Sequence, residues 1–270
     1  EAVRVVGDTV YVGSVVGGLY RWDEDGLRLL ADGQSRLRGI WAGPGWVVSH
    51  TFGAEQMIRV LDGVRDDLDV GMSLWRTALS HDGRWLALGS ADGDVGLIDT
   101  TDWSLTVRKG HDGALDGLGF HPDSTSMTSV SGRDVQTWRV PGLEQTRTLD
   151  PGFEVRGVQY SPDGQRMVLS GGEGRIALYS DDGLLLGVVT HGAEAVTSVV
   201  FGNDGERFIT AASGGLVGLY RTEHEDHGPL GARTNLRVCR ESLQVVAIVP
   251  FPPQDTVWAP AEACEVVAAP

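Results

Sequence analysis

The sequence predicts an all-β fold built from repeated four-stranded units, and three observations support this. Similar segments recur at 77–99, 118–139, 158–180 and 199–221. Each contains a turn aspartate, and the spacings between these aspartates are 41, 40 and 41 residues: Asp82, Asp123, Asp163 and Asp204. Glycine contributes 38 of 270 residues, about twice its usual share, which indicates many tight turns. A unit of about forty residues cannot bury both faces of its sheet, so neighbouring units must stack, and radial closure leaves only short edges exposed.

The elements inside each unit are predicted to be short strands. Apolar residues alternate or run over five to seven positions, as in RWLALGS and RFITAA. Ten Asp-Gly pairs punctuate the chain, and Asp-Gly supplies the positive φ that tight hairpin turns require. Trp41, Trp46 and Trp85 fall within strand patterns, so we expect them in the core. Because no segment shows a capped 3.6-residue apolar period, we expect almost no helix.

A second column of large residues extends the repeat toward the N-terminus. Its members are Trp22, Leu61, Ile98, Trp138, Tyr179 and Tyr220. The units that they define span residues 1–30, 31–71, 72–110, 111–151, 152–190 and 191–228. The tail 229–270 is long enough for another unit and contains the strand-like segments NLRVCR, QVVAIVP and DTVWAP, but prolines interrupt it. We therefore expect seven units with an irregular last one, and six is the alternative.

Several motifs resemble the WD40 repeat family of β-propellers. They are YSPDG at 160–164, Trp22-Asp23 at the end of a third strand, and Gly110-His111 before a first strand. The resemblance covers residues 1 to about 250 in register with the ~40-residue period. The tail motifs LRVCR, VPFP, VWAP and a final cysteine resemble the ends of propellers in large multidomain bacterial proteins. The resemblance implies a WD40-like β-propeller whose blades are the repeated units, with residues 1–270 forming a single domain.

In that family a loop His, a strand Ser or Thr, a turn Asp and a Trp form a hydrogen-bonded tetrad. The repeats of this chain depart from the pattern. Ile98 replaces Trp in the repeat with Asp92, and Gly132 stands at the expected Asp position in the repeat with His111 and Trp138. The last two repeats pair Glu173 with Tyr179 and Gly214 with Tyr220. We therefore expect apolar packing, rather than tetrad hydrogen bonds, to hold the blades together.

The charge balance argues against two classes of partner. The chain carries 37 acidic and 22 basic side chains, a formal net charge of −15 with no basic run. Nucleic acid and anionic membranes are therefore disfavoured, because both are bound largely through Lys and Arg. No segment approaches the ~18 apolar residues of a membrane span, and no signal peptide is visible. We expect a cytoplasmic protein, and a segment of a longer chain because residue 1 is Glu1 rather than Met.

Motifs for catalysis or cofactors are missing from the chain. G-x-S-x-G, Walker A and H-E-x-x-H are absent, and GGEGRIA at 171–177 continues into a strand rather than a pyrophosphate-binding helix. We therefore expect neither an enzyme nor a cofactor. A weak metal candidate is EHEDHG at 223–228, where His224 and His227 flank acidic residues. The alternative for this segment is a solvated acidic loop.

The two cysteines, Cys239 and Cys264, lie 25 residues apart in the tail. They are too few for a disulfide framework or a zinc site, and one interpretation is two ordinary thiols of a cytosolic protein. The other is a disulfide that ties the C-terminal segment to the last strand, which their place in the bacterial-type tail favours. A bridge requires Cα atoms about 4.4–6.8 Å apart.

The resemblance also indicates where a partner would bind. In WD40-like repeats, the residue after the first apolar position of strand one faces the top surface near the channel. Those positions here are Arg4, Arg38, Trp75, Asp116, Arg156 and Thr197. Two residues earlier lie Ala2, Arg36, Ser73, Ala114, Glu154 and Ala195. Because Arg and Trp are enriched in interface hot spots, we expect a partner-binding top rim. It comprises Arg4, Arg36, Arg38, Trp75, Asp116, Glu154 and Arg156.

Two readings of this top rim remain open. It binds an acidic peptide, loop or neighbouring domain, or its arginines pair with local carboxylates and bind nothing. As to the function class, the sequence favours a non-catalytic scaffold or regulatory sensor that binds a protein partner or other domains of its own polypeptide. The alternative function is a small-molecule- or metal-binding propeller, or an enzyme with a channel site. That alternative requires ionisable residues to converge from several blades, and Asp116 with Glu154 is the single carboxylate pair at these positions.

Overall fold

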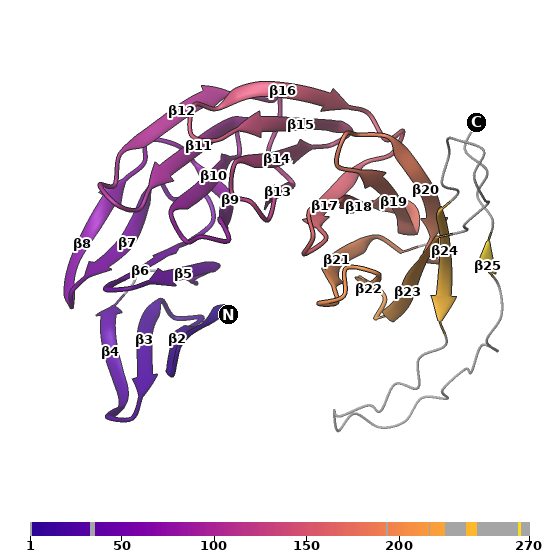
Figure 1. The fold of residues 1–270 in the computed structure, drawn as a ribbon. Helices are drawn as coiled ribbons and strands as arrows, with labels where there is room; N and C mark the ends of the chain where they lie inside the picture. The colour runs from indigo at the N-terminus through magenta and orange to yellow at the C-terminus, as the bar shows by residue number, and fades with distance from the viewer. Residues whose placement is uncertain are drawn as a thin grey trace. The chain divides into compact units, whose positions relative to one another are not determined.

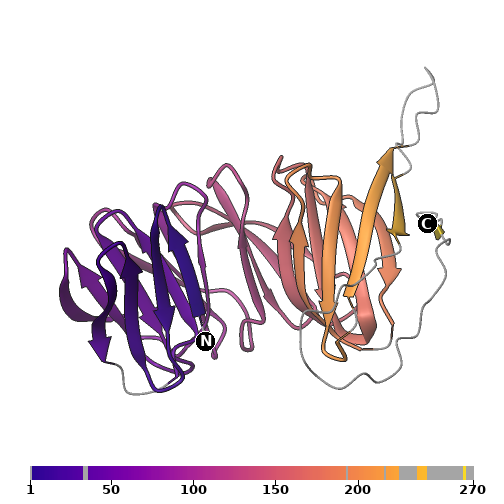
Figure 2. The same cartoon turned by 90° about the horizontal axis from the view of Figure 1, so that it is seen from below.

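A computed structural model describes residues 2–32, 36–192, 194–215, 217–224, 236–241 and 264–265 of the chain. These residues form an all-β protein of six antiparallel sheets, and their one helical element is a 3-10 turn, η1 (Gly172–Gly174). The strands of each sheet lie side by side (Figure 1, Figure 2). The chain divides into two compact units, residues 1–148 and 149–270.

Four sheets of four strands make up the first unit, and in each sheet the strands follow one another in chain order. The first sheet is β1 (Ala2–Val6), β2 (Thr9–Gly13), β3 (Gly18–Asp23) and β4 (Gly26–Asp32). The second is β5 (Gly39–Gly43), β6 (Trp46–His50), β7 (Gln56–Leu61) and β8 (Val64–Asp69). The third is β9 (Leu74–Leu79), β10 (Trp85–Ser90), β11 (Asp94–Asp99) and β12 (Leu105–Lys109). The fourth is β13 (Gly117–Phe120), β14 (Ser126–Ser131), β15 (Asp134–Arg139) and β16 (Glu144–Leu149).

The second unit holds two sheets. The fifth sheet is β17 (Val155–Tyr160), β18 (Arg166–Gly171), β19 (Arg175–Ser180) and β20 (Leu185–Thr190). The sixth is β21 (Val196–Phe201), β22 (Arg207–Ala212), β23 (Val217–His224), β24 (Leu236–Glu241) and β25 (Cys264–Glu265). In the fifth sheet, the segment GGEGRIA forms η1 and the start of β19, a turn between strands as its sequence indicates.

The tail joins the sixth sheet and does not begin a further one in the described residues. The strand-like segment NLRVCR becomes β24, which pairs with β23 from Leu219 opposite Glu241 to His224 opposite Leu236. It is the fourth strand of that sheet, so the sixth repeat extends beyond residue 228. The described residues thus account for six sheets, the smaller of the two expected counts. The segments QVVAIVP and DTVWAP lie outside them.

The repeated aspartates form the turns that connect the first and second strands of four sheets. Each accepts a backbone N–H two residues ahead through Oδ1, at 2.8–3.1 Å, an arrangement typical of Asx turns. The pairs are Asp82 with Arg84, Asp123 with Thr125, Asp163 with Gln165 and Asp204 with Glu206. The forty-residue spacing of the sequence is therefore the spacing of one hairpin turn per sheet.

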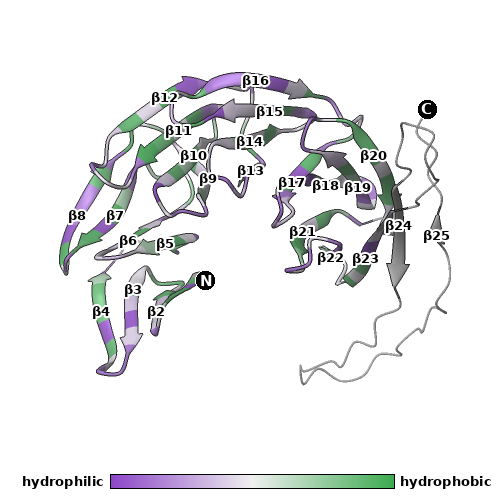
Figure 3. Cartoon of the chain, in the orientation of Figure 1, coloured by the Kyte–Doolittle hydropathy of each residue, from purple (hydrophilic) through white to green (hydrophobic). Residues whose placement is uncertain are grey.

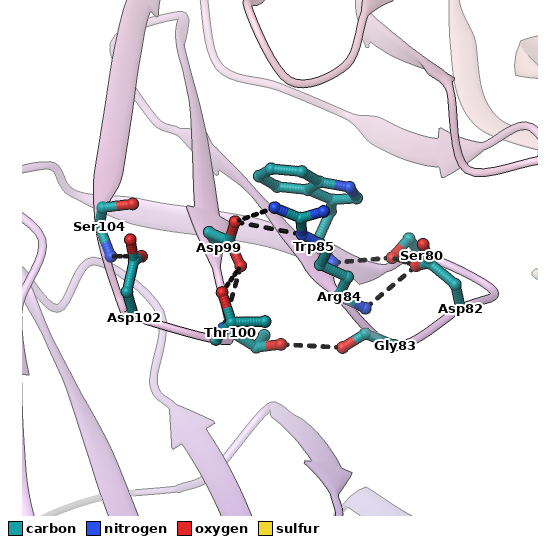
Figure 4. A network of polar contacts seen from close by, with 10 residues as sticks. Ser80, Asp82, Gly83, Arg84, Trp85, Asp99, Thr100, Asp102 and Ser104 are labelled. Carbon is teal, nitrogen blue, oxygen red and sulfur yellow. Dashed lines mark hydrogen bonds and ion pairs between the residues drawn. The ribbon is translucent and has the colours of Figure 1, made fainter.

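The turn of the third sheet is connected to the end of β11 by an ion pair (Figure 4). Arg84 donates through Nη2 to Asp99 Oδ2 at 2.8 Å, and Thr101 donates its hydroxyl to Asp99 Oδ1 at 2.7 Å. The hydrogen bond from Arg84, with those from Thr101, outweighs partial burial and lowers the pKa of Asp99 to about 2. The carboxylate is therefore strongly preferred in the folded protein.

Replacing Asp99 with Asn is expected to reduce the thermal stability at pH 7, because the ion pair with Arg84 and the Thr101 hydrogen bond are weakened. A depressed pKa contributes stability that is present above the ordinary value of 3.8 and is lost as the pH falls toward 2. The difference in Tm between the parent and Asp99→Asn should therefore shrink between pH 4 and pH 2. Asp8→Asn, at an exposed turn, is the control and should leave Tm at pH 7 unchanged.

Apolar side chains from the middle strands form the core between neighbouring sheets. In the third sheet, β10 and β11 are buried at five of six positions each, whereas the outer strands β8, β12 and β16 carry many polar residues (Figure 3). One core cluster joins Val48 and Met57 of the second sheet to Leu86 and Leu88 of the third. Of the three tryptophans expected in the core, Trp46 is buried, while Trp41 and Trp85 are half-buried and pack against core clusters.

The expectation that no tetrad hydrogen bonds form is wrong for the fourth sheet. His111 Nδ1 lies 2.8 Å from Asp134 Oδ2, and its Nε2 lies 2.7 Å from Ser129 Oγ. Trp138 donates through Nε1 to the same Ser129 Oγ at 2.7 Å. The fourth member is Asp134, two residues after the glycine at the expected position. Because the hairpin is tight, that residue is also within reach of the histidine.

The sixth sheet retains one bond of this kind. His191 Nδ1 lies 2.6 Å from the Tyr220 hydroxyl, and both side chains are buried. Tyrosine thus takes the place of tryptophan at this position and supplies its O–H group where tryptophan would supply Nε1–H. Gly214 at the expected Asp position has no side chain to extend the chain of bonds.

One face of the first sheet is apolar and exposed. Two rows of cross-strand neighbours cover it, and five of the eight side chains are more than half exposed. The rows are Val3, Val12, Tyr20 and Leu29, and Val5, Val10, Trp22 and Leu27. The opposite face supplies Leu19 and Ala31 to a core cluster shared with the second sheet. The first sheet is therefore apolar on both faces, which is typical of a sheet with a contact surface on each side.

Candidate functional site

The expected top-rim residues lie at the start of the first strand of each sheet. In the first unit, Arg4 is in β1, Arg36 and Arg38 precede β5, Trp75 is in β9 and Asp116 precedes β13. In the second unit, Glu154 precedes β17, Arg156 is in β17 and Thr197 is in β21. The repeat therefore places these residues in or just before the first strand of their sheets, and the side-chain contacts can be compared unit by unit.

Phe52 is the centre of the contacts in the first unit. It lies in the connection between β6 and β7 and is 39% exposed. The Arg38 guanidinium carbon is 4.5 Å from the centroid of the Phe52 ring, and the Trp75 ring centroid is 4.8 Å from it at an interplanar angle of 36°. The Arg76 guanidinium lies 5.8 Å from the same ring. Residues from the second and third sheets thus meet around one aromatic ring.

Arg4 stacks on a second aromatic ring, which is held in place by hydrogen bonds. The Arg4 guanidinium carbon lies 5.1 Å from the centroid of a Trp41 ring. Trp41 donates through Nε1 to Thr77 Oγ1 at 2.9 Å, and Thr77 Oγ1 lies 2.9 Å from His50 Nε2. His50 donates through Nδ1 to the Thr51 carbonyl oxygen at 3.2 Å, so its Nε2 is the acceptor of the Thr77 hydroxyl.

Burial lowers the pKa of His50, and the positive charge of Arg76 acts in the same direction, against the Thr51 hydrogen bond. The imidazole is therefore neutral at pH 7, which agrees with its role as an acceptor for Thr77. This chain of bonds joins β5, β6 and β9 beneath the Trp41 ring. Arg4 consequently rests on an aromatic ring whose orientation is determined by two neighbouring sheets.

We call Arg4, Arg38, Trp41, Phe52, Trp75 and Arg76 the aromatic–arginine surface. Within the described part of the chain, neither Arg4 nor Arg38 has a carboxylate within 4.0 Å, and Arg4 Nε is buried without a hydrogen-bond partner. Both guanidinium groups are instead stacked on rings. The chain as a whole has a net charge of −15, so these two stacked cations stand in a predominantly acidic protein.

The remaining top-rim residues make internal contacts. Arg156 Nη2 lies 3.3 Å from Glu154 Oε2, an exposed ion pair within the second unit. Asp116 accepts the Gly132 N–H through Oδ2 at 3.1 Å, and its carbonyl oxygen accepts a bond from Arg76 Nε at 2.9 Å. Local pairing, the second reading of the top rim, therefore describes Arg156, whereas Arg4 and Arg38 have no such ion pair among the described residues.

The metal candidate lies mostly outside the described residues. His224 is the last residue of β23, and His227 falls outside the described part. Among the described residues, no group of three or more His, Cys, Asp or Glu side chains is arranged to hold a metal ion. No helix in that part is long and apolar enough to cross a membrane.

Three residues of the aromatic–arginine surface are not among the rim residues expected from the sequence: Trp41, Phe52 and Arg76. Trp41 was expected in the core, and Phe52 was not singled out, because it lies outside the first-strand positions that the resemblance highlights. Arg76 follows Trp75 and was likewise not included. The sequence feature that could have indicated Phe52 is the segment Thr51-Phe52-Gly53. There a large apolar residue follows a strand and precedes a turn glycine.

Comparisons with known proteins agree with the fold. No family model matches the chain. An uncharacterized WD repeat-containing protein of Synechocystis sp. is 29% identical over 140 residues, which cover 50% of this chain and 40% of that protein. The matched region therefore spans less than half the length of this curated relative. A chain in the crystal structure of a mitotic checkpoint complex has a TM-score of 0.67 at 15% identity, covering 80% of this chain and 73% of that chain.

Consecutive four-stranded antiparallel sheets with a hairpin turn every forty residues define a β-propeller. Together with the WD repeat relative and the hydrogen bonds around Trp138, they make the chain similar to the β-propellers of the WD40 repeat family. Propellers of this family are generally protein-interaction scaffolds and are typically not catalytic. The similar chain of the solved structure is itself part of a protein complex.

Proposed function

We propose that the protein is a non-catalytic interaction module, a scaffold or regulatory propeller, that binds an acidic segment through the aromatic–arginine surface. The segment belongs to a protein partner or to another domain of the same polypeptide. The observation that carries the proposal is that Arg4 and Arg38 stack on Trp41 and Phe52 with no carboxylate in reach among the described residues.

The chemistry of these side chains favours a carboxylate-rich ligand. A guanidinium group presents parallel N–H donors that match a carboxylate, and stacking on an aromatic ring leaves its edge free to donate. The rings restrict the arginine rotamers, so less conformational entropy is lost on binding. Trp75 and Phe52 add apolar area beside the charge, a combination that is typical of binding hot spots.

We also propose that residues 1–270 form one propeller domain. The hairpin spacing continues unchanged from Asp123 in the first unit to Asp163 in the second, and one solved chain matches 80% of the sequence length. Both observations support a single array of blades. The small-molecule, metal or channel-enzyme alternative has no comparable support from the described contacts.

Charge reversal of the two stacked arginines tests the proposed function. The double variant Arg4→Glu/Arg38→Glu should lower the affinity for a captured partner at least about thirtyfold, because even one hot-spot arginine contributes about 2 kcal/mol. Partners are captured on the immobilised chain from the source cell, and their acidic segments are then titrated as synthetic peptides by calorimetry. The binding constant should also fall steeply with salt concentration.

The matched control is Arg28→Glu/Arg108→Glu, which makes the same change in net charge at exposed arginines of β4 and β12. It should leave the affinity within about twofold of the parent, since a distant surface charge contributes little. Equal loss in both double variants would show that net charge alone matters. Unchanged capture by Arg4→Glu/Arg38→Glu would refute the proposal.

A further inference from the structure

The two cysteines of the chain occupy opposite positions on neighbouring strands. β24 and β25 pair in antiparallel register, with Cys239 opposite Cys264 and Val238 opposite Glu265. The residues lie 25 positions apart in the sequence, and the chain contains no other cysteine. The register therefore pairs the only two thiol-bearing residues of 270 directly across a strand boundary.

This backbone placement meets the separation that a disulfide requires. Directly opposed residues of antiparallel strands have Cα atoms about 4.5–5.5 Å apart, within the range of about 4.4–6.8 Å observed for bridged cysteines. A shift of one residue in the register would place Cys239 opposite a neighbour of Cys264 and remove the match. β25 has two residues, so the paired region is short and one of its two residue pairs is the cysteine pair.

We propose that Cys239 and Cys264 form an intramolecular disulfide that joins β24 to β25. The bond links two positions that lie 25 residues apart in the sequence. It is independent of the aromatic–arginine surface, which lies in the other unit. Its role is to cross-link β24 and β25, whose pairing comprises two residue pairs.

The oxidant is a low-molecular-weight disulfide such as glutathione disulfide. One cysteine thiolate attacks a glutathione sulfur, forming a mixed disulfide and releasing one glutathione thiolate, which takes a proton. The second cysteine thiolate then attacks the protein sulfur of the mixed disulfide and releases the second glutathione. Two protein thiols are oxidised, one glutathione disulfide is reduced to two thiols, and no further reactant is needed.

Trypsin digestion of the whole chain gives a direct test. Cleavage after Arg237 and Arg240 releases the tripeptide 238–240 with Cys239, and the C-terminal peptide 241–270 with Cys264 contains no further Lys or Arg. After incubation with glutathione disulfide and blocking of free thiols with iodoacetamide, we expect one non-reduced species. Its mass should be the sum of both peptides less two hydrogens, and reduction should separate it into the two peptides.

The single variants Cys239→Ser and Cys264→Ser are the matched controls. In each, the remaining cysteine should appear as an alkylated thiol or a glutathione adduct, and the linked species should be absent. Non-reducing electrophoresis of the parent should show a monomer, because the bond is within one chain. Two alkylated cysteines, two glutathione adducts or a disulfide-linked dimer in the parent would each overturn the proposal.

Discussion

Replacing His111 with alanine is expected to lower the free energy of unfolding by about 3 kcal/mol. The imidazole is buried and bridges Asp134 to Ser129, which in turn accepts the Trp138 Nε1–H bond. Removing the ring leaves the Ser129 hydroxyl without its acceptor and opens a cavity in the core. The loss is measured by urea unfolding followed through tryptophan fluorescence.

The matched control is His121→Ala in the same sheet. His121 Nδ1 also lies 2.8 Å from an aspartate, Asp123, but the carboxylate is 51% exposed, and such surface pairs contribute less than about 1 kcal/mol. A large loss at His111 and a small loss at His121 would show that the buried chain of bonds stabilises the sheet. Equal losses would contradict that role and favour apolar packing alone.

The His111→Ala variant should also differ from the parent in its dependence on pH. Burial lowers the pKa of His111, and Asp134 only partly opposes this effect. The unfolded chain therefore takes up a proton more readily, so the stability from neutral His111 is present above pH 6.5 and declines as the pH falls below it. Compared with the parent, His111→Ala should lose part of that decline between pH 7.5 and pH 5.5, as followed by urea unfolding at each pH.

Replacing Gly93 with alanine is the second substitution with a large expected effect. Gly93 has φ of +92°, and a Cβ atom there would lie 2.0 Å from the carbonyl oxygen of His111. The Gly93 carbonyl oxygen also accepts the His111 N–H at 2.9 Å, so the two backbones are held against each other. Because neither backbone can yield without breaking this contact, we expect a loss of about 3 kcal/mol or more in urea unfolding.

Gly83→Ala provides the comparison within the same sheet. Gly83 also follows an aspartate in a hairpin turn and has φ of +76°, but no heavy atom lies within 4 Å of a Cβ built there. Only the left-handed backbone is strained, at a cost of about 1 kcal/mol. If both variants lose the same stability, the close approach of the two backbones at Gly93 has no effect.

Much of the fold could be predicted from the chain alone. The repeated aspartates form the hairpin turns of four sheets, and the strand segments follow the alternation of apolar and polar residues. Such features are local, since a turn residue and its neighbours determine the backbone conformation within a few positions. Because the local pattern repeats along the chain, it also predicts a series of similar sheets.

Contacts between distant residues could not be obtained in this way. Asp134 completes the bonds of His111 although the family pattern indicated the position of Gly132, because a side chain at either place in a tight hairpin can reach the imidazole. Likewise, the Phe52 ring contacts both Arg38 and Trp75, which come from two different sheets. No spacing in the sequence relates these three residues.

The sequence by itself determined an all-β repeat and the aspartate turns that connect the first two strands of four sheets. The tertiary structure alone decided that Arg4 and Arg38 stack on Trp41 and Phe52 and lack a carboxylate among the described residues. It also decided that Gly93 is crowded while Gly83 is not. The reason is physical, because turns and strands depend on neighbouring residues, whereas stacking and crowding depend on which sheets approach each other.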